Sequence, residues 1–150
     1  MKKSELKVFT DYFGQLPLSK VKDQETRLAI VKLYCELSKL LKPVTDEIEI
    51  LRNTIVGDKQ NDVNQYVLLR EKGDEESMKK ADEMVDCIQI EKDFREATRR
   101  VYEEVLPDDV KIPKVQLGVL YEALMDCGFP KLRQDAGLST IVAEFPYFVE

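Results

Sequence analysis

The sequence contains no histidine and no tryptophan among its 150 residues. Histidine is the commonest general base in enzymes and a frequent zinc ligand. Its absence therefore excludes Ser–His and Cys–His catalytic sites and histidine-containing metal centres. Cysteine is scarce as well, with Cys35, Cys87 and Cys127 far apart and no CxxC pair. This odd, scattered set predicts neither a disulfide framework nor a zinc site, and we expect reduced, mostly buried thiols.

Long apolar runs are also missing. Lys7 and Asp11 interrupt the apolar stretch at residues 6–13, so it does not resemble the core of a signal sequence. No window approaches the roughly 18 apolar residues that a membrane-spanning helix needs. Nucleotide-binding and nucleophile motifs such as GxGxxG, the P-loop and GxSxG are absent too. We therefore expect a cytoplasmic protein without membrane contact and without enzymatic activity.

Charge is what the sequence has in abundance. Charged residues make up 35% of the chain, and 29 acidic against 23 basic side chains give a net charge of -6. An acidic surplus of this size disfavours general nucleic-acid binding, which needs a surface that neutralises phosphate. The hydrophobic fraction of 43% is still enough to build the core of one ordinary domain.

The strongest pattern is an apolar seam that predicts a long helix over residues 20–56, with Ser19 as its N-cap. Its members alternate at spacings of four and three residues over nearly four heptads: Ile30, Tyr34, Leu37, Leu41, Val44, Ile48, Leu51 and Ile55. Such spacing is typical of helices that pack together in the manner of a coiled coil. Pro43 lies inside the pattern, and because the heptad phase continues past it we expect a kink. Two helices that meet near Lys42 are the alternative.

A second long helix is predicted over residues 75–106. Between Arg70 and Glu104, 20 of 35 residues are charged and both signs alternate, as on a solvated helix face. Its apolar residues form two runs that are out of phase with each other, so we expect a stutter, a bend or a change of partner within residues 89–93. These runs are Met78, Ala81, Val85 and Ile88, followed by Phe94, Ala97, Val101 and Val105.

Shorter elements complete the expected architecture. We expect a helical flap at 4–13, capped by Ser4 and ended by Gly14, that docks its aromatic face elsewhere. A polar loop is expected at 58–65, and short strands at 66–69 and 110–112. The spacing of Leu117, Leu120, Tyr121 and Leu124 predicts a helix at 117–124. A turn should follow at 135–137, then either helix or strand at 138–145, and an aromatic tail at 145–148 that docks on another part. The predicted fold is mainly α, a long antiparallel, coiled-coil-like helical hairpin with short helices and minor β-strands at one end. It forms a single helical domain over 1–150: a flap at 1–18, the hairpin at 19–106 and a small subdomain at 107–150.

The sequence contains only incomplete versions of metal-binding and catalytic motifs. Asp58, Gln60, Asp62 and Asn64 alternate like the first half of a calcium loop, but Val63 and Leu69 occupy the positions of its glycine and its bidentate glutamate, so a polar loop is the better explanation. Carboxylates such as Asp82 and Asp86 are interleaved with bases and predict a salt-bridged surface. No catalytic, cofactor-binding or metal-ligating residue is predicted.

A basic patch occurs at one-turn spacing on the second helix and consists of Lys92, Arg95, Arg99 and Arg100. It has the chemistry to meet phosphate or an acidic partner. The neighbouring carboxylates at Glu91, Glu96 and Glu103 cancel most of its field, so we do not expect it to bind nucleic acid.

The seam itself is the predicted partner surface. Its simplest role is intramolecular, with the second helix covering the first. Leu33 and Leu40 make the stripe wider than one partner helix requires, however, and large uncovered apolar surface usually marks a protein contact. We therefore expect a protein partner at these eight residues, either another copy of the chain or a different protein.

The order of these features resembles that of small helical proteins encoded by tailed bacteriophages, across about residues 16–125. The stretches that carry the resemblance are Leu16-Pro17-Leu18, Lys42-Pro43-Val44 with Glu47 to Arg52, Phe94-Arg95-Glu96, Glu103-Glu104-Val105 and Asp109-Val110-Lys111-Ile112-Pro113. The segment from Phe129 to Glu150 departs from the pattern. The resemblance implies a phage origin, with the host cytoplasm or the virion as location, and a structural or assembly role without catalytic residues.

Three functions from different classes fit the sequence, the last of them an enzyme that uses carboxylates and a divalent metal. The first is a non-enzymatic phage accessory protein that acts through protein contacts of its helical hairpin, in virion structure or assembly. The alternative is a small acidic inhibitor that binds a host enzyme or defence protein, because an acidic surface suits mimicry of nucleic acid. Sedimentation that detects self-association favours the first function, and copurification of a host enzyme favours the second.

A charge placed in the seam provides the first test. Either Leu41→Asp or Ile48→Asp is expected to abolish folding or partner binding, because each buries an unpaired carboxylate. Circular dichroism of the purified variants measures the loss of folding, and light scattering measures the loss of association. The control, Glu83→Gln, should change almost nothing. If Glu83→Gln instead removed an activity, the surface-charge interpretation of the second helix would be wrong.

Overall fold

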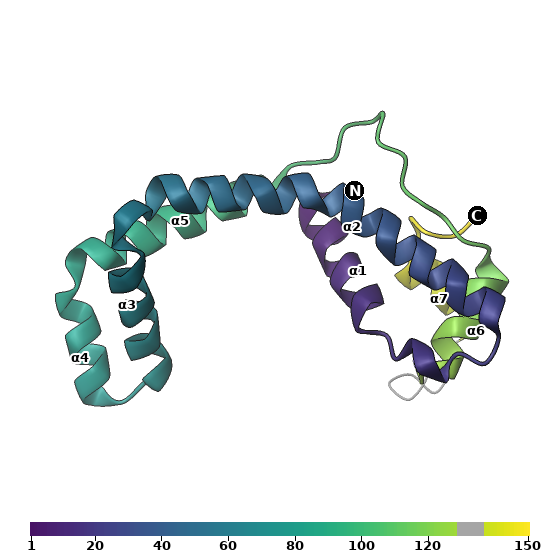
Figure 1. The fold of residues 1–150 in the computed structure, drawn as a ribbon, viewed down its shortest axis with the longest axis horizontal. Helices are drawn as coiled ribbons and strands as arrows, with labels where there is room; N and C mark the ends of the chain where they lie inside the picture. The colour runs from purple at the N-terminus through teal and green to yellow at the C-terminus, as the bar shows by residue number, and fades with distance from the viewer. Residues whose placement is uncertain (129–136) are drawn as a thin grey trace. The chain divides into compact units, whose positions relative to one another are not determined.

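The computed structural model describes residues 1–128 and 137–150 (Figure 1). It confirms that the fold is mainly α. The helices of this part of the chain are α1 (Lys3–Gln15), α2 (Gln24–Ile55), α3 (Gln60–Lys72), α4 (Glu75–Glu83), α5 (Val85–Glu103), α6 (Leu117–Asp126) and α7 (Leu138–Glu144), with 3-10 turns η1 (Leu18–Lys20) and η2 (Gly57–Lys59).

The chain forms two compact units. The first unit contains residues 1–42 and 105–150, and the second unit contains residues 43–104. The boundary between them lies within α2, at Lys42 and Pro43. These boundaries differ from those of the predicted flap, hairpin and C-terminal subdomain.

Helix α2 runs through Pro43 as one helix of 32 residues. The alternative of two helices meeting near Lys42 is therefore wrong, while the expected kink stays a prediction.

Helix α2 begins at Gln24, later than expected. The Asp23 carboxylate accepts hydrogen bonds from the backbone amide of Thr26 at 2.8 Å and from its hydroxyl at 3.0 Å. These bonds hold the pKa of Asp23 below its usual value. Asp23 therefore supplies the N-terminal cap, and Ser19 lies in η1.

Helix α1 continues past Gly14, where we expected it to end. A side chain at Gly14 would place its Cβ 2.8 Å from the ring of Tyr34 on α2. The glycine therefore permits close approach of Tyr34 and does not terminate the helix. The helix also starts before Ser4, at Lys3, and the backbone amide of Lys2 donates to the Glu5 carboxylate at 2.7 Å.

The predicted loop at 58–65 and the predicted strand at 66–69 are both wrong, because η2 and α3 occupy these residues. The apolar pair Val63 and Tyr66 is three residues apart and buried, which is the periodicity of a helix packed on one face. The predicted strand at 110–112 is irregular backbone. In the described part of the chain, β pairing is limited to isolated bridges, between Lys2 and Val105 and between Val115 and Val149.

The predicted second long helix is two helices. They separate at Met84, whose φ of -86° and ψ of 63° leave the helical region. Residues 89–93, where we expected a bend, lie in continuous helix. Ala81 and Cys87 are both buried, yet six residues of straight helix would turn them to different faces. The break at Met84 allows both side chains to enter one core. Helix α5 then ends at Glu103, short of the expected Leu106.

In the first unit, the aromatic face of α1 packs against the C-terminal aromatic segment. The ring centroids of Phe9 and Phe148 are 4.7 Å apart, and those of Phe13 and Phe145 are 5.7 Å apart. Half-burial in this cluster raises the pKa of Tyr12 to about 12. Both docking expectations are thus confirmed, and the two segments dock on each other.

Helices α6 and α7 complete the first unit. The predicted helix at 117–124 is confirmed as α6, and α7 shows that residues 138–144 are helical. The predicted turn at 135–137 falls largely outside the described residues. The backbone amide of Lys22 donates to Asp126 at 3.0 Å, and the hydroxyl of Thr26 donates to Glu122 at 3.2 Å, so α6 is tied to the start of α2.

Truncation of the aromatic cluster is the test of this packing. Phe148 is fully buried, so Phe148→Ala should lower the free energy of unfolding by about 3–5 kcal/mol through lost burial and a residual cavity. Urea denaturation followed by circular dichroism measures the change. Leu28→Ala is the control, because Leu28 is 57% exposed on α2 and its truncation should cost no more than about 0.5 kcal/mol. Equal losses in the two variants would contradict the assigned packing.

Candidate functional site

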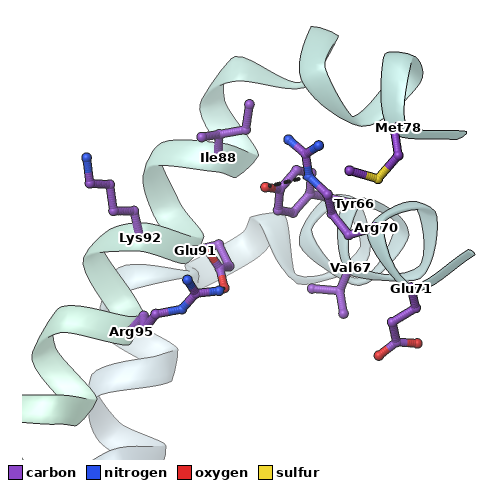
Figure 2. A pocket seen from close by; sticks show the side chains of 9 residues that line it. All are labelled: Tyr66, Val67, Arg70, Glu71, Met78, Ile88, Glu91, Lys92 and Arg95. Carbon is purple, nitrogen blue, oxygen red and sulfur yellow. Dashed lines mark hydrogen bonds and ion pairs between the residues drawn. The ribbon is translucent and has the colours of Figure 1, made fainter. Parts of the chain in front are cut away.

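A groove of about 700 Å³ lies between α3 and α5 in the second unit, and we call it the α3–α5 groove (Figure 2). Helices α3, α4 and α5 all contribute to its lining. The lining residues are Tyr66, Val67, Arg70 and Glu71 from α3, Met78 from α4, and Ile88, Glu91, Lys92 and Arg95 from α5.

A small apolar core holds the walls of the groove in place. Its buried members come from the turn after α2 and from α3, α4 and α5, and are Val56, Val63, Tyr66, Ala81 and Cys87. Ile88 packs against this core from α5 and also lines the groove. Tyr66 is thus buried on its core side, while Val67, the next residue along α3, is 36% exposed in the groove. The groove therefore has an apolar floor on a fixed frame.

Arg70 is the polar side chain with the best-defined position in the groove. Its Nε donates to the Tyr66 hydroxyl at 3.1 Å, and its Nη1 lies 2.8 Å from a carboxylate oxygen of Asp82 on α4. The guanidinium carbon also lies 5.1 Å from the centroid of the Tyr66 ring. The Tyr66 hydrogen bond, followed by the contact with Asp82, raises the pKa of Arg70. These contacts hold a permanent positive charge beside the apolar floor.

The opposite wall carries the other charges of the groove. Glu91 and Arg95 form an ion pair along α5, and in Figure 2 Arg95 reaches toward Glu91 while Lys92 and Glu71 point away from the floor. The charges nearest the floor are therefore already paired. Such an arrangement is suited to apolar side chains of a ligand, with polar groups to orient them at the rim.

Three members of the basic patch on α5, Arg95, Arg99 and Arg100, are paired with carboxylates of the same helix. Arg99 bridges Glu96 at 2.7 Å and Glu103 at 2.9 Å, and Arg100 lies 3.2 Å from Glu96. Hydrogen bonds from Arg99 and then Arg100 lower the pKa of Glu96 to about 2. The expected salt-bridged surface is also confirmed at Asp82 with Arg70, and at Asp86 with Lys59 at 3.3 Å.

The eight seam residues are divided between the two units. In the first unit, Ile30, Leu37 and Leu41 are buried, while Tyr34 is 38% exposed. In the second unit, Val44 is buried, and Ile48, Leu51 and Ile55 are half-buried. Much of the seam is thus covered by the chain itself, and its role as a partner surface stays a prediction.

The cysteines differ in environment more than expected. Cys87 is buried, Cys127 is half-buried and Cys35 is exposed, and all three are free thiols. Burial raises the pKa of Cys87 and of Cys127. Both thiols therefore favour the protonated, unreactive form.

The calcium-like segment also receives a different structure from the one expected. Asp58 lies in η2 and Asp62 in α3, so their alternating oxygens are distributed around helical turns. Among residues 1–128 and 137–150, no group of three or more His, Cys, Asp or Glu side chains is arranged to hold a metal ion. None of the described helices combines the length and the apolarity that crossing a membrane requires.

Sequence reasoning did not find the α3–α5 groove. Tyr66 and Val67 of its lining lie in the segment that we predicted as a strand, and Arg70 follows Tyr66 by four residues. That spacing places two side chains on one helix face, and it becomes informative only once the segment is known to be helical. No protein-family model, curated protein sequence or solved structure matches this chain.

The ion pairs of α5 predict a pH dependence. Because the folded-state pKa of Glu96 is about 2 against its ordinary value of 4.5, its pairs stabilise the fold above pH 4.5. That stability should be lost as the pH falls toward 2. In urea denaturation at a series of pH values, Glu96→Gln should make the acid-induced loss of stability smaller than in the wild type. Glu83→Gln is the matched control and should retain the wild-type slope.

Proposed function

We propose that the chain is a non-enzymatic protein that works by binding another protein, and that the α3–α5 groove is its contact surface. The observation that carries this proposal is the open apolar floor of the groove. Val67 and Ile88 contribute to this floor, and the core of the second unit holds it in place. Apolar surface that remains accessible on a rigid support is typical of protein contacts.

The chemistry of the lining supports binding over catalysis. The groove supplies neither cysteine nor serine nor threonine, and its half-buried carboxylate, Glu91, is held in an ion pair with Arg95. Arg70 is well placed to orient a partner, since its own contacts with Tyr66 and Asp82 fix the guanidinium.

We also propose that the end of α2 and α5 form an antiparallel helical pair within the second unit. The support is the Arg52 guanidinium carbon, which lies 5.9 Å from the centroid of the Phe94 ring. Figure 1 draws the two helices running in opposite directions along this stretch. This pair is the part of the expected hairpin that would brace the outer wall of the α3–α5 groove.

A role in virion structure or assembly is proposed from the sequence resemblance to phage proteins alone. Two features of that resemblance, the short apolar strand at 66–69 and the edge strand at 110–112, are helix and irregular backbone in this chain. The features that remain are the long helix with a central proline and the glutamate-rich second helix. The proposal therefore takes its binding surface from the groove and only its biological setting from the resemblance.

Photo-crosslinking tests the groove as a contact surface. The full chain, carrying a benzophenone amino acid in place of Val67, should form covalent adducts with a protein in an extract of the source cells. The same group in place of Ile50 is the control, because Ile50 is 65% exposed in the second unit and lies outside the groove. Adducts that form equally from both positions, or from neither, would refute the proposal.

A charge on the groove floor provides the quantitative test. Once the crosslinked protein is purified, Val67→Glu should weaken its binding at least tenfold, because the glutamate would lose water without gaining a partner. Ile50→Glu has the same chemistry and should leave the dissociation constant within about twofold, as surface substitutions usually do. Isothermal titration calorimetry measures both constants, and thermal unfolding confirms that both variants are folded.

A further inference from the structure

A second hollow in the same unit lies between α3 and α4 and has a different chemical character. It measures about 460 Å³, and its lining consists of Gln65, Leu68, Leu69, Lys72 and Lys80. We call it the lysine groove. Helices α3 and α4 lie side by side here, joined by the left-handed Gly73 at the end of α3 (Figure 1).

The lysine groove opens on another face of α3 than the α3–α5 groove. With about 100° of rotation per residue, Leu68, Leu69 and Lys72 gather on one side of the helix, and Val67 and Arg70 on the other. The two hollows share no lining residue. A ligand in one of them would therefore leave the other open.

The lining pairs apolar surface with positive charge and contains no carboxylate. Leu68 is 57% exposed, so an apolar side chain stands uncovered beside the two ammonium groups. This composition contrasts with a chain whose net charge is -6. An opposite charge pattern on a partner would complement it.

Acidic groups lie near the two lysines, although none of them lines the groove. Asp74 accepts hydrogen bonds from the amide and the hydroxyl of Ser77, and these bonds, with Lys72 and Lys80 nearby, lower its pKa. Glu76 lies 3.3 Å from Lys80, but both side chains of this pair are largely exposed. Exposed pairs of this kind contribute little and are readily exchanged for another carboxylate.

We propose that the lysine groove binds a peptide segment of a partner protein in which aspartate or glutamate flanks an apolar side chain. The apolar side chain would cover Leu68 and Leu69, and the carboxylates would pair with Lys72 and Lys80. This inference rests on the proposed function in assigning a protein contact to the second unit, and it adds a separate surface and the chemistry of its ligand.

Selection from a peptide library tests the chemistry of the ligand directly. A yeast-displayed library of random 16-residue peptides is selected on the full chain, and the enriched peptides are measured by fluorescence anisotropy. We expect enriched sequences that combine acidic residues with Leu, Ile, Phe or Met. Their binding should weaken at least tenfold in the double variant Lys72→Glu/Lys80→Glu and should weaken as salt is raised. Failure to enrich any peptide, or enrichment of peptides without acidic residues, would overturn the proposal.

Lys79 provides the matched control, because it lies on α4 next to Lys80 but lines neither groove. Lys79→Glu should leave the dissociation constants within twofold of the wild type. The milder double variant Lys72→Gln/Lys80→Gln removes the charge without adding repulsion to Glu76, and it should still weaken binding if the glutamate variant fails to fold. Binding that survives in both double variants, or that Lys79→Glu abolishes equally, would overturn the proposal.

Val67→Glu separates this proposal from that of the α3–α5 groove. Peptides held in the lysine groove should bind the Val67→Glu variant normally. Peptides that lose binding only in Val67→Glu would support the first groove and refute the second. Sedimentation of the wild-type chain tests whether a second copy of the chain occupies the lysine groove. A dimer that dissociates in the Lys72→Glu/Lys80→Glu variant would show that it does, and would overturn the assignment to a separate partner.

Discussion

The packing of α2 is the constraint on which the rest of the structure depends. This one helix supplies Ile30, Leu37 and Leu41 to the buried residues of the first unit, and Val44, just past Pro43, is buried as well. Its continuity through Pro43 requires one missing backbone hydrogen bond, which is tolerated because apolar side chains are buried on both sides of the proline. Helix stability here thus comes from packing more than from propensity.

Many of the charged side chains on α5 are paired with one another. Ion pairs at i, i+3 and i+4 run along α5, and Arg70 joins α3 to Asp82 on α4. Such exposed pairs contribute little stability individually, but they reduce the field that would attract a polyanion. Surface that does not take part in such ion pairs is therefore a candidate for binding a partner. The apolar floor of the α3–α5 groove and the exposed Leu68 of the lysine groove are places where the second unit presents uncovered apolar surface beside positive charge.

The break at Met84 shows how tertiary packing overrides a sequence pattern. The charge pattern and the helix-forming residues from Glu75 onward indicate a single long helix, and the mismatch of apolar phases suggested a bend at 89–93. The actual break lies earlier, because Ala81 and Cys87 have to enter the same core with Val63 and Tyr66. The position of this helix break depends on packing against the neighbouring helix α3. The sequence pattern did not reveal it, because we had predicted most of that segment as loop and strand.

The sequence by itself determined the elements that have a long or complete local pattern. The seam predicted α2, the spacing of Leu117, Leu120 and Leu124 predicted α6, and the clustered aromatics predicted that both ends of the chain dock. Only the tertiary structure decided that 66–69 is helical, because a four-residue apolar run fits either a strand or one turn of helix. It also decided where the two grooves lie, since each is formed by side chains from separate helices whose contacts depend on long-range packing.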